Sequence, residues 1–392
     1  MSDVDAPGRG REVVRAKLMH AAAALLADAP PTEVTSKQIA DRAGVNHGQI
    51  HHYFGSKDDL VAATIQDGDA RYHQDRLADG ERFPLPIETE VRSPSWRTLA
   101  YLAASGIWRQ PPFDPSPIVN ALAVRRAEDS GLSPTDTHVM ADVAGTMAMQ
   151  RGWWILRDII ETALGAYDPD IPAIRAEVAE RSLRLIDSQL PIGEPGEETD
   201  IAPIQTEVGE GTPRGREAVQ QSLVLAAYEL LAERPPAQVT TKEIAALAGV
   251  NHGQVHHYFE SKEHLIAQTI RFGAAPLLEA MEDGSAPVPV PIRTSTRHPM
   301  WRTLAHIAST EAWVHEAYGR APVVLKMVEV VAERTGKPTT CTSVHSQVAA
   351  VHALELGWAI YRDIIEYSLD ALGGDIPAVR SRLAAISCRL VD

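Results

Sequence analysis

Two stretches of this chain carry the same set of hydrogen-bonding side chains at the same spacing. Residues 43–54 read AGVNHGQIHHYF, and residues 248–259 repeat them with a single change, Ile50 to Val255. Glutamine can bond N7 and N6 of adenine together, and a helix that presents such side chains near its start fits the DNA major groove. The pattern predicts two surfaces that read base edges. The candidates for base contacts are His47, Gln49 and His52, with His252, Gln254 and His257, and the glycines that allow close backbone approach are Gly48 and Gly253.

Lysines and hydroxyl-bearing side chains flank both stretches. Ammonium and hydroxyl groups bond phosphate oxygens, which position a protein on a duplex. The predicted phosphate contacts are Thr35, Lys37, Tyr53 and Lys57, with Thr240, Lys242, Tyr258 and Lys262. The rest of the predicted DNA-binding face is Asn46, His51, Asn251 and His256, and the arginines at 9, 11, 15, 214 and 216 could follow the backbone. Because the formal net charge is −15, the attraction to DNA has to come from a local basic patch.

Simpler roles are open for some of these residues. Gln49 can close a capping box with Asn46 and then make no base contact. Lys57 can be an ordinary solvated side chain at a helix start. His47 and His51 have the i,i+4 spacing of zinc ligands, but no third ligand is fixed nearby. We therefore predict neither a metal site nor a cofactor.

The residues around each stretch predict a helix, a glycine turn and a second helix. Thr35 with Gln38 fits a capping box that begins the first helix, and the second copy keeps this pattern. Gly44 suits the turn, because glycine adopts a positive φ without strain. Aligned without gaps, residues 34–61 and 239–266 are identical at 19 of 28 positions. The two surfaces should therefore have the same shape.

The whole chain repeats itself with a constant offset. Trp96 recurs as Trp301 and Gly152 as Gly357, each 205 residues later. A period this long indicates a duplicated domain and not a solenoid of short repeats. The apolar spacing in each copy is helical, which predicts an all-α fold.

Three further helices and one connection are predicted in the remainder of the first unit. The helices cover residues 96–109, 138–165 and 171–185, and the middle one is apolar on two faces, so it should be buried on both. Gly152 and Gly357 should let two such helices approach closely where the copies meet. The two copies diverge over residues 68–92 and carry prolines there, which predicts a loop-rich connection.

Each unit begins with a recognisable pattern. In the first unit, T-x-x-x-I-A-x-x-A-G-V-x-x-G runs from Thr35 to Gly48, and Y-F-x-S-K-x-x-L runs from Tyr53 to Leu60. The same pattern recurs 205 residues later. Both copies resemble the N-terminal signature of TetR-family transcriptional regulators. That family commonly has a tyrosine where His51 stands, and its members are usually homodimers of single units.

The resemblance implies a DNA-binding domain above an all-α ligand and dimerisation domain, in which a bound small molecule moves the DNA-binding parts and releases DNA. Two units in one chain imply an intrachain pseudo-dimer that binds double-stranded DNA, with further self-association left open. We expect a ligand-responsive repressor of a near-palindromic operator. The implied divisions are two DNA-binding domains at residues 10–67 and 214–272, two ligand and dimerisation domains at 68–187 and 273–392, and a linker at 188–213.

Candidates for the small-molecule site come from the larger domains. They are Trp108, Met147, Trp154, Trp313 and His352. Trp154 stands opposite Ala359 in the second unit, so one unit could hold a ligand that the other cannot. Tryptophans in such positions are more often core residues than ligand contacts, and a histidine such as His352 is more often a satisfied core histidine.

The remaining features limit the class of protein. Cys341 and Cys388 offer no disulfide framework or metal spacing. No charged-then-apolar leader and no apolar run long enough to span a bilayer is evident, which favours the cytoplasm and no membrane partner. A sensor or interaction protein of the same fold without DNA binding is the alternative function. An enzyme built on the histidines would lack a nucleophile–base set, so we expect no catalysis.

Overall fold

The computed structural model describes residues 7–27, 29, 31, 33–78, 87, 89–90, 98–100, 103, 117–185, 213, 215–234, 236–284, 301, 303–305, 308 and 321–390. Within these ranges every regular element is a helix and no strand is present, so the predicted all-α class is confirmed. None of the helices in these ranges is long and apolar enough to cross a membrane.

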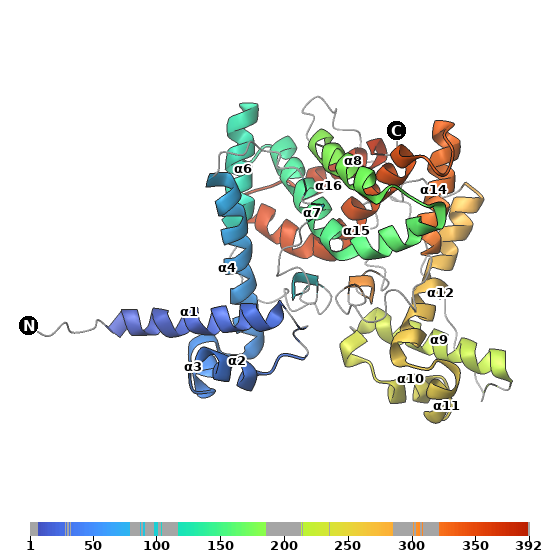
Figure 1. The fold of residues 1–392 in the computed structure, drawn as a ribbon, viewed down its shortest axis with the longest axis horizontal. Coiled ribbons are helices and arrows are strands. Elements are labelled where there is room, and N and C mark those ends of the chain that lie inside the picture. The colour runs from blue at the N-terminus through green and yellow to red at the C-terminus, as the bar shows by residue number, and fades with distance from the viewer. Residues whose placement is uncertain are drawn as a thin grey trace, which may run out of the picture.

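The two units follow one another with the same order of helices (Figure 1). The first unit contains α1 (Pro7–Leu26), α2 (Ser36–Ala43), α3 (Gly48–Phe54), α4 (Lys57–Ala78), α6 (Pro117–Ser130), α7 (Thr137–Leu164) and α8 (Ile171–Arg184). The second contains α9 (Arg216–Glu233), α10 (Thr241–Leu247), α11 (Gly253–Tyr258), α12 (Lys262–Glu282), α14 (Pro322–Thr335), α15 (Thr342–Asp370) and α16 (Ile376–Arg389). Most of the segment 96–109, predicted as a helix, lies outside the described residues, but 98–100 and 103 are helical.

The helices start where the preceding residues can cap them. The Thr35 hydroxyl oxygen accepts the Gln38 N–H at 3.2 Å, and Gln38 Oε1 accepts the Thr35 N–H at 2.7 Å. Asp136 accepts the His138 N–H at 2.8 Å at the start of α7. These acceptors satisfy N–H groups that a helix start otherwise leaves without partners. The predicted capping box and the predicted long helix over 138–165 are confirmed.

The connection between the smaller and larger domains begins as a helix, contrary to prediction. α4 continues to Ala78 and α12 continues to Glu282. The loop-rich connection expected from residue 68 is therefore wrong as far as Ala78, and the domain limits drawn after 67 and after 272 fall inside helices. In α12, burial of Gly273 and Leu277 accompanies packing against α9 and α14. Such packing outweighs the low helix propensity of glycine.

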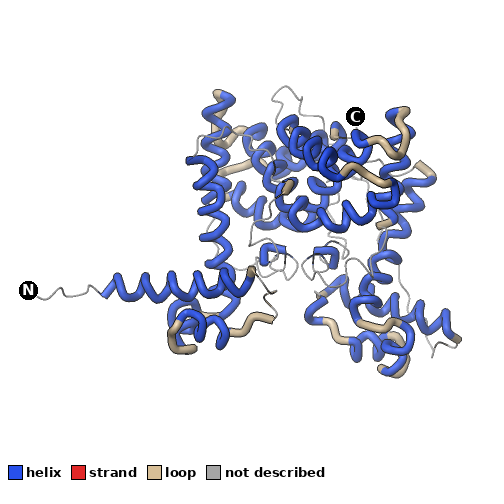
Figure 2. The backbone as a smooth tube through the Cα atoms, viewed as in Figure 1, coloured by secondary structure: helices blue, strands red, loops and turns tan. Residues whose placement is uncertain are grey.

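The two units contact each other through their long helices, and the last helix of each unit packs on the long helix of the other. α7 packs against α15, while α8 of the first unit packs on α15 and α16 of the second packs on α7. Figures 1 and 2 show the helix pairs α2–α3 and α10–α11 projecting from the same side of this central layer. The two motifs of the sequence are therefore presented in one direction.

α7 and α15 approach most closely where Gly152 meets Gly357. A Cβ added to Gly152 would lie 1.9 Å from the carbonyl oxygen of Ala353 and 2.8 Å from the Cα of Gly357. A Cβ added to Gly357 would lie 1.9 Å from the carbonyl oxygen of Ala148. Since backbone atoms occupy these places, only glycine fits, and the predicted close approach at the two glycines is confirmed.

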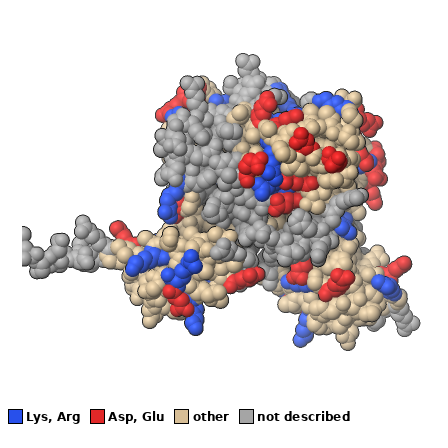
Figure 3. Space-filling model, viewed as in Figure 1, with Lys and Arg blue, Asp and Glu red and all other residues tan. Residues whose placement is uncertain are grey.

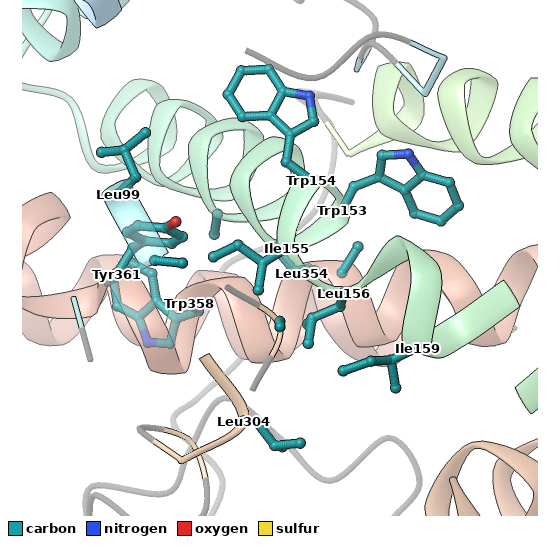
Figure 4. Close-up of a cluster of buried hydrophobic side chains, with 14 of the residues drawn as sticks. Leu99, Trp153, Trp154, Ile155, Leu156, Ile159, Leu304, Leu354, Trp358 and Tyr361 are labelled. Atoms are coloured by element: carbon teal, nitrogen blue, oxygen red, sulfur yellow. The ribbon is translucent and has the colours of Figure 1, made fainter. Parts of the chain in front are cut away.

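Large aromatic side chains fill the core around this crossing (Figure 4). Trp153 and Trp154 on α7, and Trp358 and Tyr361 on α15, are each at most 2% exposed. Each aromatic side chain of this size buries roughly 150–250 Å² of surface. The hydrophobic core therefore runs without interruption from one unit into the other.

Candidate nucleic-acid interface and apolar cavity

Each unit presents one helix-turn-helix pair, here called a reading head: α2–α3 is the first and α10–α11 the second. The turn contains Gly44 with a φ of 64° in the first head and Gly249 with a φ of 66° in the second. A side chain with a Cβ is strained in this left-handed region. The glycine therefore permits the tight turn that sets the second helix against the first.

The second helix of each head directs its polar side chains to solvent. His47, His51 and His52 are exposed, as are their counterparts on α11. Ile50 is only 3% exposed and Val255 is fully buried. The single difference between the two recognition segments thus lies inside the protein, and the segments 43–54 and 248–259 offer the same types of side chain to a partner. The first helices of the heads differ at the surface, where Asp41 and Arg42 correspond to Ala246 and Leu247.

The heads differ in how their glutamines are held. Asn46 Oδ1 accepts the Gly48 N–H at 2.9 Å, and the second head repeats this bond. In the second head, Gln254 Oε1 also accepts the Asn251 N–H at 3.2 Å. Gln254 therefore takes the capping role that the sequence left open as an alternative for the glutamine, while its amide nitrogen is not used in this bond.

Lys57 and Lys262 turn toward the protein. Lys57 Nζ donates to the carbonyl oxygens of Pro31 at 2.8 Å and Val34 at 3.0 Å. Lys262 Nζ donates to the carbonyl oxygen of Pro236 at 2.6 Å, and burial lowers its pKa. These bonds fasten the starts of α4 and α12 to the loops that precede α2 and α10. The structure gives both lysines an anchoring role, while their contact with phosphate stays a prediction.

The other predicted phosphate ligands fall into three groups. Lys37 and Lys242 are exposed. The hydroxyls of Thr35 and Thr240 belong to capping boxes at the helix starts. The remaining two, Tyr53 and Tyr258, are partly buried. Figure 3 shows acidic and basic side chains interspersed over both lower projections on the face in view.

Arg15, on α1, contacts the second helix of the first head. Its Nη1 donates to the carbonyl oxygen of Tyr53 at 2.7 Å, and its guanidinium carbon lies 4.3 Å from the centre of the Phe54 ring. The equivalent residue of the second unit is Gln220. Because a cation over an aromatic ring is attracted to its face, Arg15 fastens α1 to α3, and the second head has no cation at that position.

The histidines of the heads do not assemble a metal site in the part of the chain that the structure describes. The rings of His252 and His256 lie 5.5 Å apart at 87°. No group of three or more His, Cys, Asp or Glu side chains within the described ranges is placed to hold a metal ion.

A largely apolar cavity opens in the second unit, where the end of α7 meets α12, α14 and α15. Its volume is about 630 Å³, open mouth included. The residues that line it are Leu156, Ile159, Ile160, Leu277, Trp301, Leu304, Ala321, Val323, Val324, Met327, His352, Glu355 and Leu356. Figure 4 shows Leu156 and Ile159 on the side of α7 that faces Leu304. Leu277 on α12 connects the cavity wall directly to the helix that enters the second reading head.

Two polar groups in this wall are perturbed by burial. Burial raises the pKa of Glu355 to about 8, even though Ser387 Oγ donates to Glu355 Oε1 at 2.5 Å. Burial lowers the pKa of His352 to about 4. Its Nδ1 lies 2.9 Å from the carbonyl oxygen of Val348. A carbonyl only accepts, so Nδ1 carries the proton and Nε2 is left as an acceptor.

The corresponding place in the first unit is filled differently. Glu355 and Leu356 correspond to Gln150 and Arg151 at the offset of 205. The guanidinium carbon of Arg151 lies 5.4 Å from the centre of the Tyr361 ring, and both side chains are at most 4% exposed. Arg151 corresponds to Leu356 and Tyr361 to Leu156, and both leucines line the cavity. A stacked arginine and tyrosine therefore fill the equivalent place in the first unit.

The sequence-predicted ligand residues are distributed unevenly around this cavity. His352 lines it. Met147 and Trp154 are buried in the core, are not among the lining residues, and the indole of Trp154 points away from Leu304 (Figure 4). Trp108 and Trp313 lie outside the described residues. Glu355 was missed, although comparison of the two units at that position would have revealed an acid where the first unit has an amide.

A family profile matches both units of this chain, and individual known proteins match part of it. The sequence profile described as "Bacterial regulatory proteins, tetR family" matches residues 18–64 and again residues 223–269. The chain is 30% identical over 167 residues to the "HTH-type transcriptional repressor Rv3405c" of Mycobacterium tuberculosis (strain ATCC 25618 / H37Rv), a match that covers 42% of this chain and 85% of that protein. It is 41% identical over 83 residues to the "HTH-type transcriptional regulator BetI" of Rhizobium meliloti (strain 1021), covering 21% of this chain and 41% of that relative.

The extent of these matches agrees with the duplication. A relative matched over 85% of its length uses only 42% of this chain, so one unit here corresponds to nearly one whole relative. The profile falls on α1 to α4 and again on α9 to α12, which contain the two reading heads. The chain therefore belongs to the tetR family of bacterial regulatory proteins, as a DNA-binding transcriptional regulator made of two family units in tandem.

Proposed function

We propose that the chain is a ligand-responsive repressor that binds a near-palindromic operator with both reading heads of one molecule, paired as an intrachain pseudo-dimer. The observation that carries this proposal is that the recognition segments 43–54 and 248–259 have the same exposed side chains and lie on heads that project from the same side (Figure 1). Ile50 and Val255, the one difference between the recognition segments, are buried. The same side chains should prefer the same bases, so the two half-sites should be alike.

The proposed contacts divide into base-reading and phosphate-binding groups. The base-reading candidates are His47, Gln49 and His52 with His252, Gln254 and His257, backed by Gly48 and Gly253. The backbone-binding candidates are Thr35, Lys37, Asn46, His51, Tyr53 and Lys57, with Thr240, Lys242, Asn251, His256, Tyr258 and Lys262. Lys37 and Lys242 are the strongest phosphate candidates, because they are exposed while Lys57 and Lys262 are bonded to loop carbonyls.

Selection of bound duplexes from a random pool tests the operator prediction. We expect an inverted repeat of one half-site. Removal of either half-site should lower affinity by about 10²–10⁴-fold, because the second head binds at the effective concentration set by the first. Two unrelated half-sites would contradict the proposal. No enrichment at low salt would favour the alternative, a small-molecule sensor or interaction protein that does not bind DNA.

The effector proposed for this regulator is an apolar molecule that carries an amine, bound in the cavity of the second unit. Both polar groups in the wall can accept a hydrogen bond, His352 through Nε2 and Glu355 through its carboxyl oxygens. An ammonium group would pair with an ionised Glu355 in a low-dielectric surrounding, where such attraction is strong. Because Arg151 and Tyr361 fill the counterpart positions, one effector per chain is expected.

Calorimetric titration with octylamine, octanol and octanoate tests the ligand class, since the three share an apolar tail. Octylamine should bind at one site per chain and at least about tenfold more tightly than octanol, the gain expected for one charge-assisted hydrogen bond. The preference should disappear in Glu355→Gln. Equal or tighter binding of octanoate, or two equivalent sites per chain, would contradict the proposal.

A bound effector would act on DNA through α12. This helix supplies Leu277 to the cavity and begins at Lys262, next to the second reading head. Filling the cavity would displace α12 and change the spacing of the two heads. The route is short because only the turn at residues 259–261 separates α12 from the last helix of the head.

A further inference from the structure

A buried charge cluster lies where α16 of the second unit packs on α7 of the first. Asp142 Oδ2 accepts from Arg126 Nε at 2.9 Å, and Asp142 Oδ1 lies 3.5 Å from Arg382 Nη2. The side chains of Asp142 and Arg382 are fully buried and that of Arg126 is 9% exposed. Burial raises the pKa of Asp142 although both guanidiniums oppose this. A carboxylate so placed depends on its cations, because loss of one partner leaves a buried charge poorly compensated.

The symmetry-related contact, between α8 of the first unit and α15 of the second, lacks this cluster. At the offset of 205, Asp142 corresponds to Gln347, Arg126 to Val331, and Arg382 to Glu177. Glu177 instead accepts from Ser346 Oγ at 2.6 Å. The two halves of the interface are similar in shape but differ in charge.

Arg181 gives the second contact its own polar pattern. Its Nε donates to Ser346 Oγ at 3.1 Å, and its Nη2 donates to Ser343 Oγ at 3.3 Å. The residue that corresponds to Arg181 in the second unit is Ile386, which is buried. Each last helix therefore carries side chains suited to the long helix of the unlike unit.

Pairing of like units would place the wrong charges together. Two first units would bring Glu177 opposite Asp142 at both contacts, so an acid would stand where Arg382 stands now. Two second units would bring Arg382 opposite Gln347, an amide in place of a carboxylate. Both arrangements lose the contact between Asp142 and Arg382. In the first, Asp142 keeps Arg126 of its own unit but gains a second carboxylate in place of a guanidinium, which adds repulsion.

We propose that the cluster of Asp142, Arg126 and Arg382 makes the pairing surface selective, so that a first unit accepts a second unit and rejects another first unit. The selectivity rests on the pairing of units that forms part of the proposed function. It does not depend on DNA binding, so its failure and the failure of the operator prediction would be separate results. Such a surface prevents two chains from joining through like units.

Exchange between cleaved chains tests this selectivity. A protease site is inserted between residues 195 and 205, the folded protein is cut, and the two fragments are unfolded in urea and refolded together. Native mass spectrometry then separates like pairs from unlike pairs, because the fragments differ in mass. Unlike pairs should exceed their statistical share by at least about 100-fold, as expected for loss of a buried ion pair. A statistical mixture would overturn the proposal.

A gain-of-function variant sharpens the test. Glu177→Arg places a cation opposite Asp142 in a pair of first units, so such pairs should appear after exchange. Glu177→Gln is the matched control, since it removes the acid without adding the cation and should yield far fewer like pairs. Equal yields from both variants would show that the charge at position 177 does not determine pairing, and would overturn the proposal.

The uncut chain provides an independent measurement that needs no exchange. A double-mutant cycle of Asp142→Asn and Arg382→Gln reports the coupling between the two side chains through the unfolding equilibrium in urea. The single substitutions should interact by at least about tenfold in that equilibrium constant, which lies within the range for residues in contact. Additive effects would contradict the assigned role of the pair.

Discussion

Gly152→Ala is expected to separate or severely distort the pairing of the two units. The added Cβ would lie 1.9 Å from a carbonyl oxygen of α15 and 2.8 Å from Gly357 Cα. Neither atom belongs to a flexible side chain, so the two helices would have to move apart along the whole crossing. We expect the free energy of unfolding to fall by about 3–5 kcal/mol, at the upper end for overpacking of a core. Urea unfolding measures the loss, and affinity for an operator with two half-sites should fall with it.

Gly145→Ala on the same helix is the matched control. The nearest atom to its added Cβ is the end of the Leu383 side chain, at 3.2 Å. That side chain can shift, and alanine favours the helix by about 1 kcal/mol over glycine. The control should therefore change stability by less than about 1 kcal/mol. Equal effects of Gly145→Ala and Gly152→Ala would exclude the close crossing as the reason for the glycine.

Glu355→Gln should stabilise the protein at alkaline pH and change it little at acid pH. Burial raises the pKa of Glu355 from 4.5 to about 8. Between these values the folded protein holds a proton that the unfolded chain has released, so stability falls as pH rises through this window. Glutamine does not titrate and can still accept from Ser387. The difference between variant and unmodified protein should grow by roughly 2–4 kcal/mol from pH 5 to pH 9.

Urea unfolding at a series of pH values measures this difference. His352, with a pKa lowered to about 4 from 6.5, gives the opposite trend between those values, since its unfolded form binds the proton more readily. That contribution is common to both proteins and cancels in the comparison. Glu282→Gln, at an exposed position of α12, should leave the pH profile unchanged. A constant difference across the pH range would contradict the raised pKa of Glu355.

The all-α class and the two heads could be predicted because their signals are local. Gly44, the Thr35–Gln38 capping box and the apolar spacing around them each act over a few residues, and the repeat presented every signal twice. The expected loop from residue 68 was wrong because α12 buries Gly273 and Leu277 against other helices. Packing of that kind depends on partners that are distant in sequence, and local propensity does not report it.

The site was less predictable because it depends on where the polar end of each side chain lies in the folded protein. Lys57 has the position of a phosphate ligand in the motif, yet its ammonium group reaches carbonyls 23 and 26 residues earlier in the chain. Glu355 is a single acid in a long helix, and no local sequence pattern marks it as a ligand contact. The signal for the cavity lies in differences between the two units at the offset of 205. Gln150 stands where the second unit has Glu355, and Arg151 stands where it has Leu356. Composition and periodicity do not contain this signal.

The packing of α7 on α15 within one polypeptide also affects how this regulator responds to its own abundance. A regulator assembled from separate subunits follows mass action, so a cell with few copies holds a growing share of single subunits that bind DNA weakly. In the proposed intrachain pseudo-dimer both partners are synthesised together, and dilution cannot part them. While most of the proposed operator is free, its occupancy should therefore rise in proportion to copy number, without the steep threshold that assembly imposes on scarce subunits.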